Sequence, residues 1–359
     1  MSRRIRVLLV APTAPLVGGQ AIQARRLAEK LPEVPGLEVR LLSVNPTLPG
    51  PFGAMQRVKY LRTAVTSLAY FWSLLRAVPH ADIVHAFSAS YWSFLLAPVP
   101  AMLVAKLFGK RIVLNYRSGE GDDHLTHWRS ARWGTRLADR IVVQSGYLEE
   151  VFARHGFAAL VVPNFVDTSL ISYRDRPLPR ARFFGNRHFE PLYNVPCVVR
   201  AFAVVQRAVP DAELTLAGDG AQRGELERLV AELGLRNVRF TGRVQPQEMP
   251  ALYDWAEVYL NAPNIDNMPG SVIECFAAGL PLVSTDAGGI PHIVADGVSG
   301  LLVPVGDHEG LGRAALRLLQ EPGLAHRLAT AAFAESQARY VWPAVREKWA
   351  ALYSELAAG

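Results

Sequence analysis

The sequence alternates short apolar runs with longer helical patterns, and it goes through this alternation twice. In the first half the strand-like runs lie at residues 5–11, 39–44, 83–87, 112–115 and 141–144. In the second half they lie at residues 181–184, 213–217, 238–241, 258–261 and 280–285. Helical patterns separate them, and neighbouring parallel strands need such crossover connections. The pattern therefore predicts an α/β fold with two doubly wound sheets.

The length supports two domains. A chain of 359 residues, half of them hydrophobic, is long for a single core and sufficient for two. A charged, proline-bearing segment at 172–182 is the expected linker, which gives domains at 1–176 and 177–340. Residues 341–359 form a last helix with regularly spaced aromatic residues, and we expect it to cross back to the first domain.

The charge is divided unevenly. Residues 1–176 carry 22 Lys and Arg against 12 Asp and Glu, a balance of +10, and residues 177–359 carry 16 against 20, a balance of −4. A basic half indicates an anionic partner, which by charge alone is a membrane surface, a phosphorylated acceptor or nucleic acid; a solvated arginine-rich surface is the alternative. Of these partners we expect a membrane surface and no nucleic acid. The two cysteines, Cys197 and Cys275, have no metal-ligand spacing and fit a reducing compartment, so we expect a cytoplasmic protein, peripheral on the inner face of a membrane.

Two apolar segments raise the question of a membrane. Residues 86–105 contain no charge, but Pro98 and Pro100 interrupt them, which favours a buried helix, loop and helix over a span. Residues 56–78 form a helical pattern with a broad aromatic and aliphatic side flanked by Arg62 and Arg76. Such a helix can lie on an anionic membrane or pack into a core, because both environments favour the same pattern.

Residues 266–289, DNMPGSVIECFAAGLPLVSTDAGG, hold the densest group of chemically useful residues. Asp266 and Glu274 flank a Pro-Gly-Ser sequence that is typical of a loop entering a helix, with Ser271 as a candidate N-terminal cap. The free N–H groups of the first helical turn and the helix dipole favour an anion there. The segment therefore predicts a sugar-nucleotide site, with an ordinary capped helix as the alternative.

Two loops of the first half follow predicted strands, where α/β sheets bind ligands. Residues 13–20 contain Gly18 and Gly19 before a helix, so that backbone can approach a phosphate or sugar; this loop is neither GxGxxG nor a P-loop. Residues 116–125, YRSGEGDDHL, are too polar and glycine-rich for a core. Either they form a solvated loop or they contact an acceptor. The candidate acceptor contacts are Arg117, Glu120, Asp122, Asp123 and His124.

Together, the GG loop, PNFVD, GDG, FTGRV and the 266–289 segment resemble glycosyltransferase family 4 of the GT-B enzymes. The resemblance covers nearly the whole chain and implies two Rossmann-like domains facing a cleft. It also implies a nucleotide-diphosphate sugar as donor, an acceptor in the first domain, and transfer with retention at the anomeric carbon, with no metal and no separate cofactor.

The resemblance also implies roles for single residues. Arg187 would face the diphosphate, Asp266 the sugar hydroxyls and Glu274 the ribose, while His124 would replace a histidine that many members carry nearer the preceding strand. Arg187, Asp266 and His124 are the expected catalytic residues. The expected donor-binding residues are Gly18, Gly19, Asp219, Val244, Asn267, Met268, Pro269, Gly270, Ser271 and Glu274, and Arg117, Glu120 and Asp123 are the expected acceptor contacts.

The chain departs from the family at two positions. Tyr193 stands where members usually have a lysine, and Arg117 stands where many have the histidine. These departures leave a second hypothesis, a member that binds a nucleotide sugar or glycan without transferring it. A third is a GT-B epimerase or phosphorylase.

Overall fold

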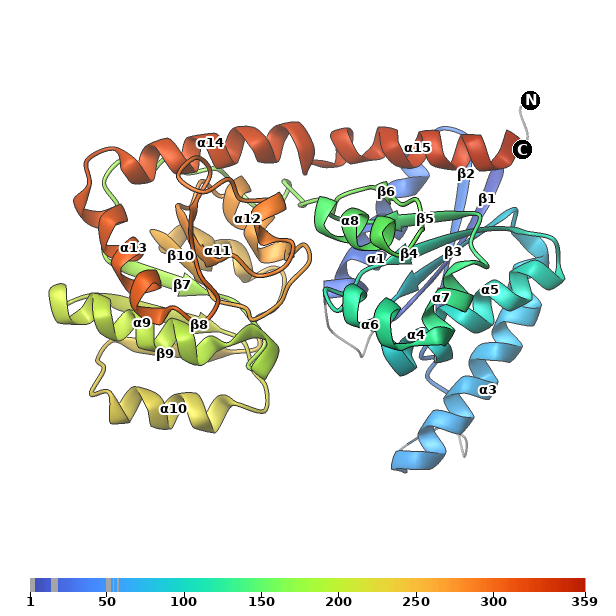
Figure 1. Ribbon diagram of the computed structural model, residues 1–359, viewed down its shortest axis with the longest axis horizontal. Helices are drawn as coiled ribbons and strands as arrows, with labels where there is room; N and C mark the ends of the chain where they lie inside the picture. Colours follow the sequence, from blue (N-terminus) through green and yellow to red (C-terminus); the bar gives the residue numbers. More distant parts are fainter. Residues whose placement is uncertain (1–3, 14–18, 50–52, 54, 57, 359) are drawn as a thin grey trace. The chain divides into compact units, whose positions relative to one another are not determined.

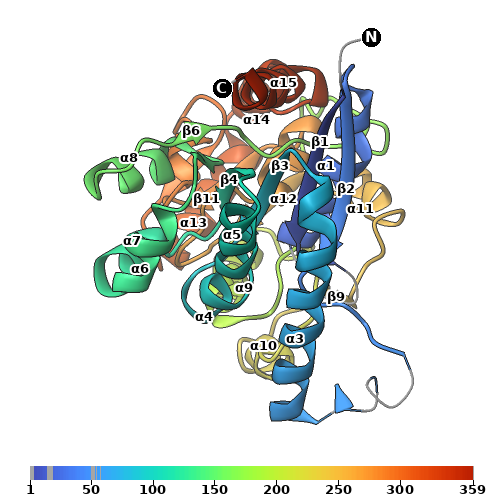
Figure 2. The ribbon, with the colours of Figure 1, turned by 90° about the vertical axis from the view of Figure 1, so that its right-hand side faces the viewer.

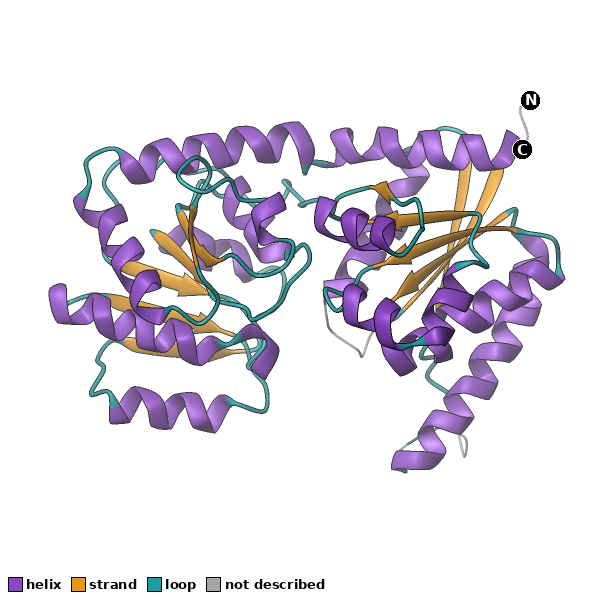
Figure 3. Cartoon of the chain, viewed as in Figure 1, coloured by secondary structure: helices purple, strands orange, loops and turns teal. Residues whose placement is uncertain are grey.

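A computed structural model describes residues 4–13, 19–49, 53, 55–56 and 58–358. The chain divides into two compact units. Unit 1 comprises Met1–Pro163 and Val345–Gly359, and unit 2 comprises Asn164–Ala344. Each is an α/β domain with helices around a parallel sheet (Figures 1 and 3), which confirms the predicted fold class. Within the described residues no helix combines the length and the apolar character needed to cross a membrane.

The sheet of unit 1 has the strand order β2-β1-β3-β4-β5-β6, and every pairing is parallel. Its strands are β1 (Ile5–Ala11), β2 (Leu37–Ser43), β3 (Ile83–Ser88), β4 (Arg111–Tyr116), β5 (Arg140–Val143) and β6 (Leu160–Val161). Its helices are α1 (Gly19–Lys30), α3 (Lys59–Ala77), α4 (Tyr91–Leu96), α5 (Pro98–Leu107), α6 (Gly121–His127), α7 (Arg129–Thr135) and α8 (Gly146–Arg154), with short 3₁₀ turns η1 (Leu31–Glu33) and η2 (Val78–His80). The 86–105 segment forms two helices, α4 and α5, as its prolines predict.

The sheet of unit 2 has the order β12-β11-β10-β7-β8-β9, again entirely parallel. Its strands are β7 (Arg182–Gly185), β8 (Glu213–Ala217), β9 (Val238–Gly242), β10 (Val258–Asn261), β11 (Leu282–Thr285) and β12 (Leu301–Val303). Its helices are α9 (Val195–Ala208), α10 (Arg223–Glu232), α11 (Met249–Trp255), α12 (Gly270–Ala277), α13 (His308–Gln320) and α14 (Leu324–Arg339), with 3₁₀ turns η3 (Pro191–Tyr193) and η4 (Ile290–His292).

Both faces of the unit 2 sheet are buried. The neighbouring residues Phe183 and Phe184 of β7 belong to two different core clusters, because successive side chains of a strand point to opposite faces. One cluster contains α9, α10 and α13, and the other contains α12 and part of α14. The two core clusters therefore pack against opposite faces of the sheet and hold β7 and β10 between them.

The last helix, α15 (Trp342–Ala358), starts in unit 2 and continues into unit 1 from Val345 onward. This matches the expected return of the C-terminal helix to the first domain. Within unit 1, the Trp349 ring lies 5.0 Å from the His85 ring of β3, and the Tyr353 hydroxyl lies 2.7 Å from His85 Nδ1. The helix is held by a buried polar contact as well as by packing.

The predicted linker at 172–182 differs from the structure, since 164–176 belongs to unit 2. Arg176 is only 2% exposed, and its guanidinium donates hydrogen bonds to the carbonyls of Tyr253 (2.8 Å), Ala256 (2.9 Å) and Ala278 (2.6 Å). A charged residue in a proline-bearing segment is typical of a solvated linker. Here the carbonyls at helix ends replace water around it.

Candidate functional site

The strand order of unit 2 reverses between β7 and β10, and open α/β sheets bind ligands beside such a switch point, at the carboxyl ends of the strands. The loop after β7 carries Arg187, and the loop after β10 carries Asp266. Although 79 positions separate them, their side chains form an ion pair, with guanidinium Nη2 on carboxylate Oδ2. The topology therefore brings together two residues that the sequence assigned to one site.

Three neighbouring side chains contact the Arg187 guanidinium. Besides Asp266, its Nη1 donates a hydrogen bond to Ser271 Oγ at 3.2 Å, and its guanidinium carbon lies 4.1 Å from the centre of the Tyr193 ring. Its side chain is only 11% exposed. Burial is the largest single effect and lowers the pKa of Arg187, but the charge of Asp266, together with the nearby Tyr193 and Tyr259, raises the pKa overall. Arg187 is therefore a fixed and permanently charged group.

Helix α12 begins at Gly270, directly beside this ion pair. Its N-cap residue is Pro269, and no side chain caps it. Ser271 lies inside the first turn and accepts from Arg187, so its prediction as the cap is wrong. Since the first N–H groups of a helix have no carbonyl within it to pair with, this end suits an anion.

Glu274 lies one turn further into α12 and ends a chain of hydrogen bonds. Tyr259 Oη donates to Asn186 Oδ1 at 2.6 Å, Asn186 Nδ2 donates to Tyr253 Oη at 2.9 Å, and Tyr253 Oη donates to Glu274 Oε2 at 2.9 Å. Burial, followed by the charge of Glu274, raises the pKa of Tyr253 well above its usual range, so Tyr253 stays a donor. Nothing in the sequence pattern distinguished Asn186, Tyr253 and Tyr259 as site residues, since tyrosines in a strand and a helix resemble core residues.

Glycines let the loops of the site approach one another. A Cβ at Gly289 would lie 1.9 Å from the Asn267 carbonyl oxygen, and one at Gly288 would lie 2.3 Å from that of Asp266. The Gly289 N–H donates to the Asp266 carbonyl at 2.8 Å. The glycines that end the 266–289 segment therefore support its beginning.

The Gly218-Asp219-Gly220 turn plays the same part for Arg187. A Cβ at Gly218 would lie 2.1 Å from the Arg187 carbonyl oxygen, and one at Gly220 would lie 2.6 Å from that of Phe189. Asp219 itself is partly exposed, and its Oδ1 accepts from the Gly220 N–H at 3.0 Å. The turn packs closely against the backbone of the Arg187 loop.

The remaining predicted donor residues lie around these loops. Asn267 is buried, with its N–H donating to Asp266 Oδ1 at 2.8 Å. The Met268 carbonyl accepts from Asn164 Nδ2 at 2.8 Å, which anchors the loop to the PNFVD segment. Val244 packs at the edge of the core cluster that contains α12.

The predicted residues of unit 1 are more scattered. Gly18 lies outside the described residues. Gly19 begins α1 with open space around it, at the end of the loop after β1. Arg117 follows β4, with its guanidinium carbon 5.1 Å from the centre of the Phe87 ring, and burial lowers its pKa to about 9. Glu120 is the N-cap residue of α6, and Asp123 is exposed and accepts from the Tyr91 hydroxyl at 2.7 Å.

His124 does not face solvent. The prediction that 116–125 lies outside the core is wrong for Tyr116 and His124, which are fully buried. Gly121 permits this, because a Cβ there would lie 2.9 Å from Leu148 Cδ2. His124 Nδ1 lies 2.9 Å from the Tyr116 hydroxyl, and burial lowers its pKa to about 4. In this conformation the imidazole is neutral and enclosed by aromatic rings.

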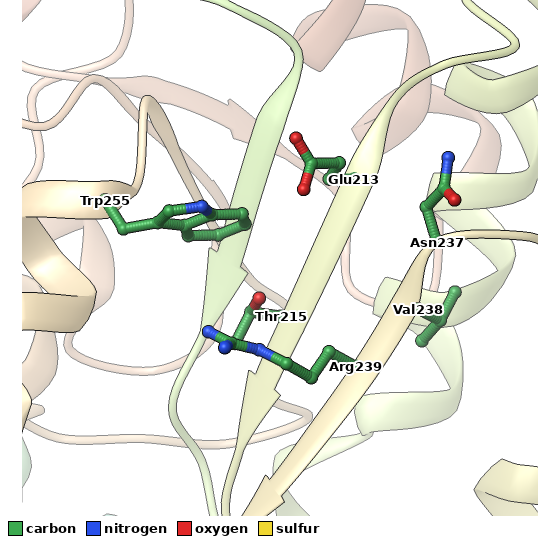
Figure 4. A pocket seen from close by; sticks show the side chains of 6 residues that line it. All are labelled: Glu213, Thr215, Asn237, Val238, Arg239 and Trp255. Carbon is green, nitrogen blue, oxygen red and sulfur yellow. The ribbon is translucent and has the colours of Figure 1, made fainter.

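A separate hollow of about 260 Å³ opens on unit 2 (Figure 4). Its lining residues are Glu213, Thr215, Asn237, Val238, Arg239 and Trp255. Glu213 and Val238 are the first residues of β8 and β9, so the hollow lies toward the amino ends of the strands. This is the end away from the switch-point loops, and none of the predicted site residues lines it.

Comparison with known proteins gives two family matches. Residues 179–321 match the family model described as Glycosyl transferases group 1, and residues 17–170 match the model described as Glycosyltransferase Family 4. Together they cover most of both halves of the chain.

Individual relatives are similar over half or nearly all of the chain. Phosphatidyl-myo-inositol mannosyltransferase of Mycobacterium leprae is 27% identical over 97% of this chain and 92% of its own length. The lipopolysaccharide core biosynthesis glycosyltransferase LpsE of Rhizobium meliloti is 34% identical over 47% of this chain and 50% of its own. Among solved structures, Anabaena Alr3699/HepE in complex with UDP-glucose has a TM-score of 0.78 at 17% identity, covering 98% of this chain and all of the other, which shows a shared fold.

Proposed function

Since the chain belongs to the group 1, family 4 glycosyltransferases, we propose that it transfers a sugar from a nucleotide-diphosphate sugar to an acceptor hydroxyl. The observation that carries the proposal is the meeting of Arg187 and Asp266 beside the uncapped start of α12, at the switch point of unit 2. Retention at the anomeric carbon and independence of metal ions are part of the proposal and rest on family membership.

The diphosphate is the group that this arrangement suits best. Arg187 supplies a fixed cation, and the N–H groups of Gly270 and Ser271 supply neutral donors at the positive end of α12. As the glycosidic bond breaks, negative charge grows on the leaving diphosphate. Donors fixed in place before the reaction stabilise this charge more strongly in the transition state than in the ground state.

The two carboxylates then have separate roles. Asp266, which is paired with Arg187, takes the sugar hydroxyls, and Glu274 takes the ribose hydroxyls. Tyr253 donates to one oxygen of Glu274 and so orients the carboxylate. The proposal assigns acceptor contacts to Arg117, Glu120 and Asp123 in unit 1.

The test measures release of nucleotide diphosphate from UDP-, GDP- and ADP-sugars. We expect Arg187→Ala to lower kcat by about 100- to 1,000-fold, as for other fixed donors to a developing anion. Glu274→Ala is expected to raise the donor KM by roughly 10- to 100-fold through a lost charged hydrogen bond. Arg313→Ala on α13, an exposed arginine away from the site, is the control and leaves both unchanged.

The products separate the alternatives. Transfer predicts a glycosylated acceptor with the anomeric configuration of the donor, measured by NMR, and a rate that EDTA does not change. Donor binding in calorimetry without turnover on any acceptor supports the binding-only hypothesis. Free sugar phosphate or an epimerised donor identifies a phosphorylase or an epimerase. Unchanged activity of folded Arg187→Ala would contradict the proposed site.

A further inference from the structure

We propose that unit 1 docks on an anionic lipid bilayer through the surface of helices α3, α4, α5 and α7, called here the four-helix surface. The proposal is independent of the donor chemistry, since all of its residues lie in unit 1 and none belongs to the switch-point loops. It starts from helix α3, which is apolar on two opposite sides although only one of them packs into the core.

One side of α3 packs into the core of unit 1, with Tyr70 and Leu74 almost fully buried. At 100° per residue, Leu61, Leu68 and Trp72 point to the opposite side. These three side chains are 38%, 71% and 54% exposed. The apolar side of residues 56–78 was compatible with a core or a membrane. In the structure one side of α3 packs into the core, and the opposite apolar side is exposed.

The exposed apolar residues continue beyond α3. Helix α5 packs against α3 and α4, and α4 packs against α7, so the four helices form a connected layer (Figures 1 and 2). Each contributes large exposed apolar side chains. Beyond α3 these are Trp92, Leu96, Leu103, Leu107 and Trp133. Large exposed apolar side chains on four helices that contact one another favour an interaction surface, whereas single exposed apolar residues are ordinary.

The charge of the layer identifies the partner. The four helices themselves contain no Asp or Glu, whereas each of α3, α5 and α7 carries lysine or arginine. Two acidic side chains from neighbouring segments contact them, Asp139 on Lys106 and Asp123 on Tyr91. On α3, Arg62 and Arg76 are exposed, and the Arg76 guanidinium carbon lies 4.8 Å from the centre of the Trp72 ring. Tryptophans and leucines that enter the acyl boundary, with cations at the height of the headgroups, match an anionic membrane interface. A second copy of this surface would instead bring like charges together.

The experiment uses the full chain and two kinds of vesicle, without donor or acceptor. One kind is phosphatidylcholine, and the other contains equal parts of phosphatidylcholine and phosphatidylglycerol. We expect co-sedimentation with the anionic vesicles alone, weakened by salt because exposed charges are screened. Binding should shift tryptophan fluorescence to shorter wavelength. Equal binding to both vesicles, or no binding to either, would overturn the proposal.

Two sets of variants separate the apolar and the charged contributions. Arg62→Glu with Arg76→Glu is expected to lower partitioning at least about twentyfold, since each basic residue near an anionic leaflet contributes substantially. Leu68→Ser with Trp72→Ser removes apolar contact, and we expect a loss of about tenfold or more.

Matched controls lie in unit 2. Leu178→Ser removes an apolar side chain that is 82% exposed, and Arg228→Glu with Arg313→Glu reverses two exposed charges. These controls should bind vesicles like the unchanged protein, and nucleotide diphosphate release from donor in solution should be the same for every variant. If the α3 variants instead split a dimer in size-exclusion chromatography and vesicles are not bound, the surface is an interface between copies and the proposal fails. Loss of donor turnover with intact vesicle binding would count against the proposed function alone.

Discussion

At the scale of single residues, Tyr193 is the side chain whose contact with Arg187 leads to the most specific prediction for donor binding. Its ring lies against the Arg187 guanidinium, with 4.1 Å between the guanidinium carbon and the ring centre. The ring face attracts a cation and, being partly buried, holds it without adding a second positive charge. We therefore expect Tyr193 to act as a positioning residue that orients the Arg187 cation.

We expect Tyr193→Ala to raise the donor KM by about tenfold, from the loss of a desolvated cation–π contact, while Tyr193→Phe keeps the ring and the affinity. Donor titrations of kcat and KM measure this. Since a purely structural role would lower the melting temperature of the alanine variant in proportion to its loss of affinity, both quantities are needed. Equal effects of Ala and Phe would rule out positioning by the ring.

At the scale of elements, the site depends on close approaches between loops that follow different strands. The loop after β10 rests on the glycines after β11, and the loop after β7 rests on the glycine turn after β8. No side chain fits between these backbones. The helix start at Gly270 and the ion pair thus depend on glycines that belong to neither of them.

Gly289→Ala tests this dependence. Its Cβ would overlap the Asn267 carbonyl, and we expect a loss of about 1–3 kcal/mol in the free energy of unfolding together with weaker donor binding. Gly224→Ala in α10, where nothing lies within 4 Å of the added carbon, is the control and should stabilise by about 0.5–1 kcal/mol. Urea unfolding and donor-induced thermal shift measure both. An unchanged Gly289→Ala protein would mean that the loop can move away at no cost.

At the scale of the whole molecule, the C-terminal helix is fastened by His85. Asn115 Nδ2 donates to His85 Nε2 at 2.9 Å, so that His85 Nδ1 carries the proton and donates to Tyr353 Oη at 2.7 Å. Burial first, and then the charge of Arg117, lowers the pKa of His85 to about 3. A second proton, on Nε2, would point at the Asn115 amide donor, so the native structure disfavours the charged imidazole.

This pKa makes the stability depend on pH. Below about pH 6.5 the unfolded chain binds a proton at His85, whereas the native chain does not until the pH approaches 3. The contribution of His85 to the free energy of unfolding is therefore fully present above about pH 6.5 and decreases as the pH falls toward 3. Between pH 7 and pH 5 the loss is about 2 kcal/mol, of which His85→Gln should remove most. Urea unfolding at both pH values measures it. An equal loss in the variant would assign the acid sensitivity to other groups, of which His124 is the nearest in kind.

Much of the fold followed from the sequence. Two rounds of buried strands and helices predicted two parallel sheets, because each apolar run was short, bounded by turns and followed by a helical period. The Asp266–Gly289 segment pointed to a donor site through residue chemistry, and the family resemblance added Arg187 to it. Segments whose composition is ambiguous were harder. Arg176 is typical of a linker, and Tyr116 and His124 lie in a segment typical of a surface loop, yet their neighbours in space bury all three side chains.

The sequence by itself determined the periodicity, the charge asymmetry and the identity of the groups that can bind an anion. Tertiary structure decided which of them meet. The Arg187–Asp266 pair, the Tyr193 ring beneath it and the chain from Tyr259 to Glu274 join residues far apart along the chain, and only the strand order places their loops at one sheet edge. It also decided which side of α3 is covered, since burial depends on what packs against a helix and not on the helix alone.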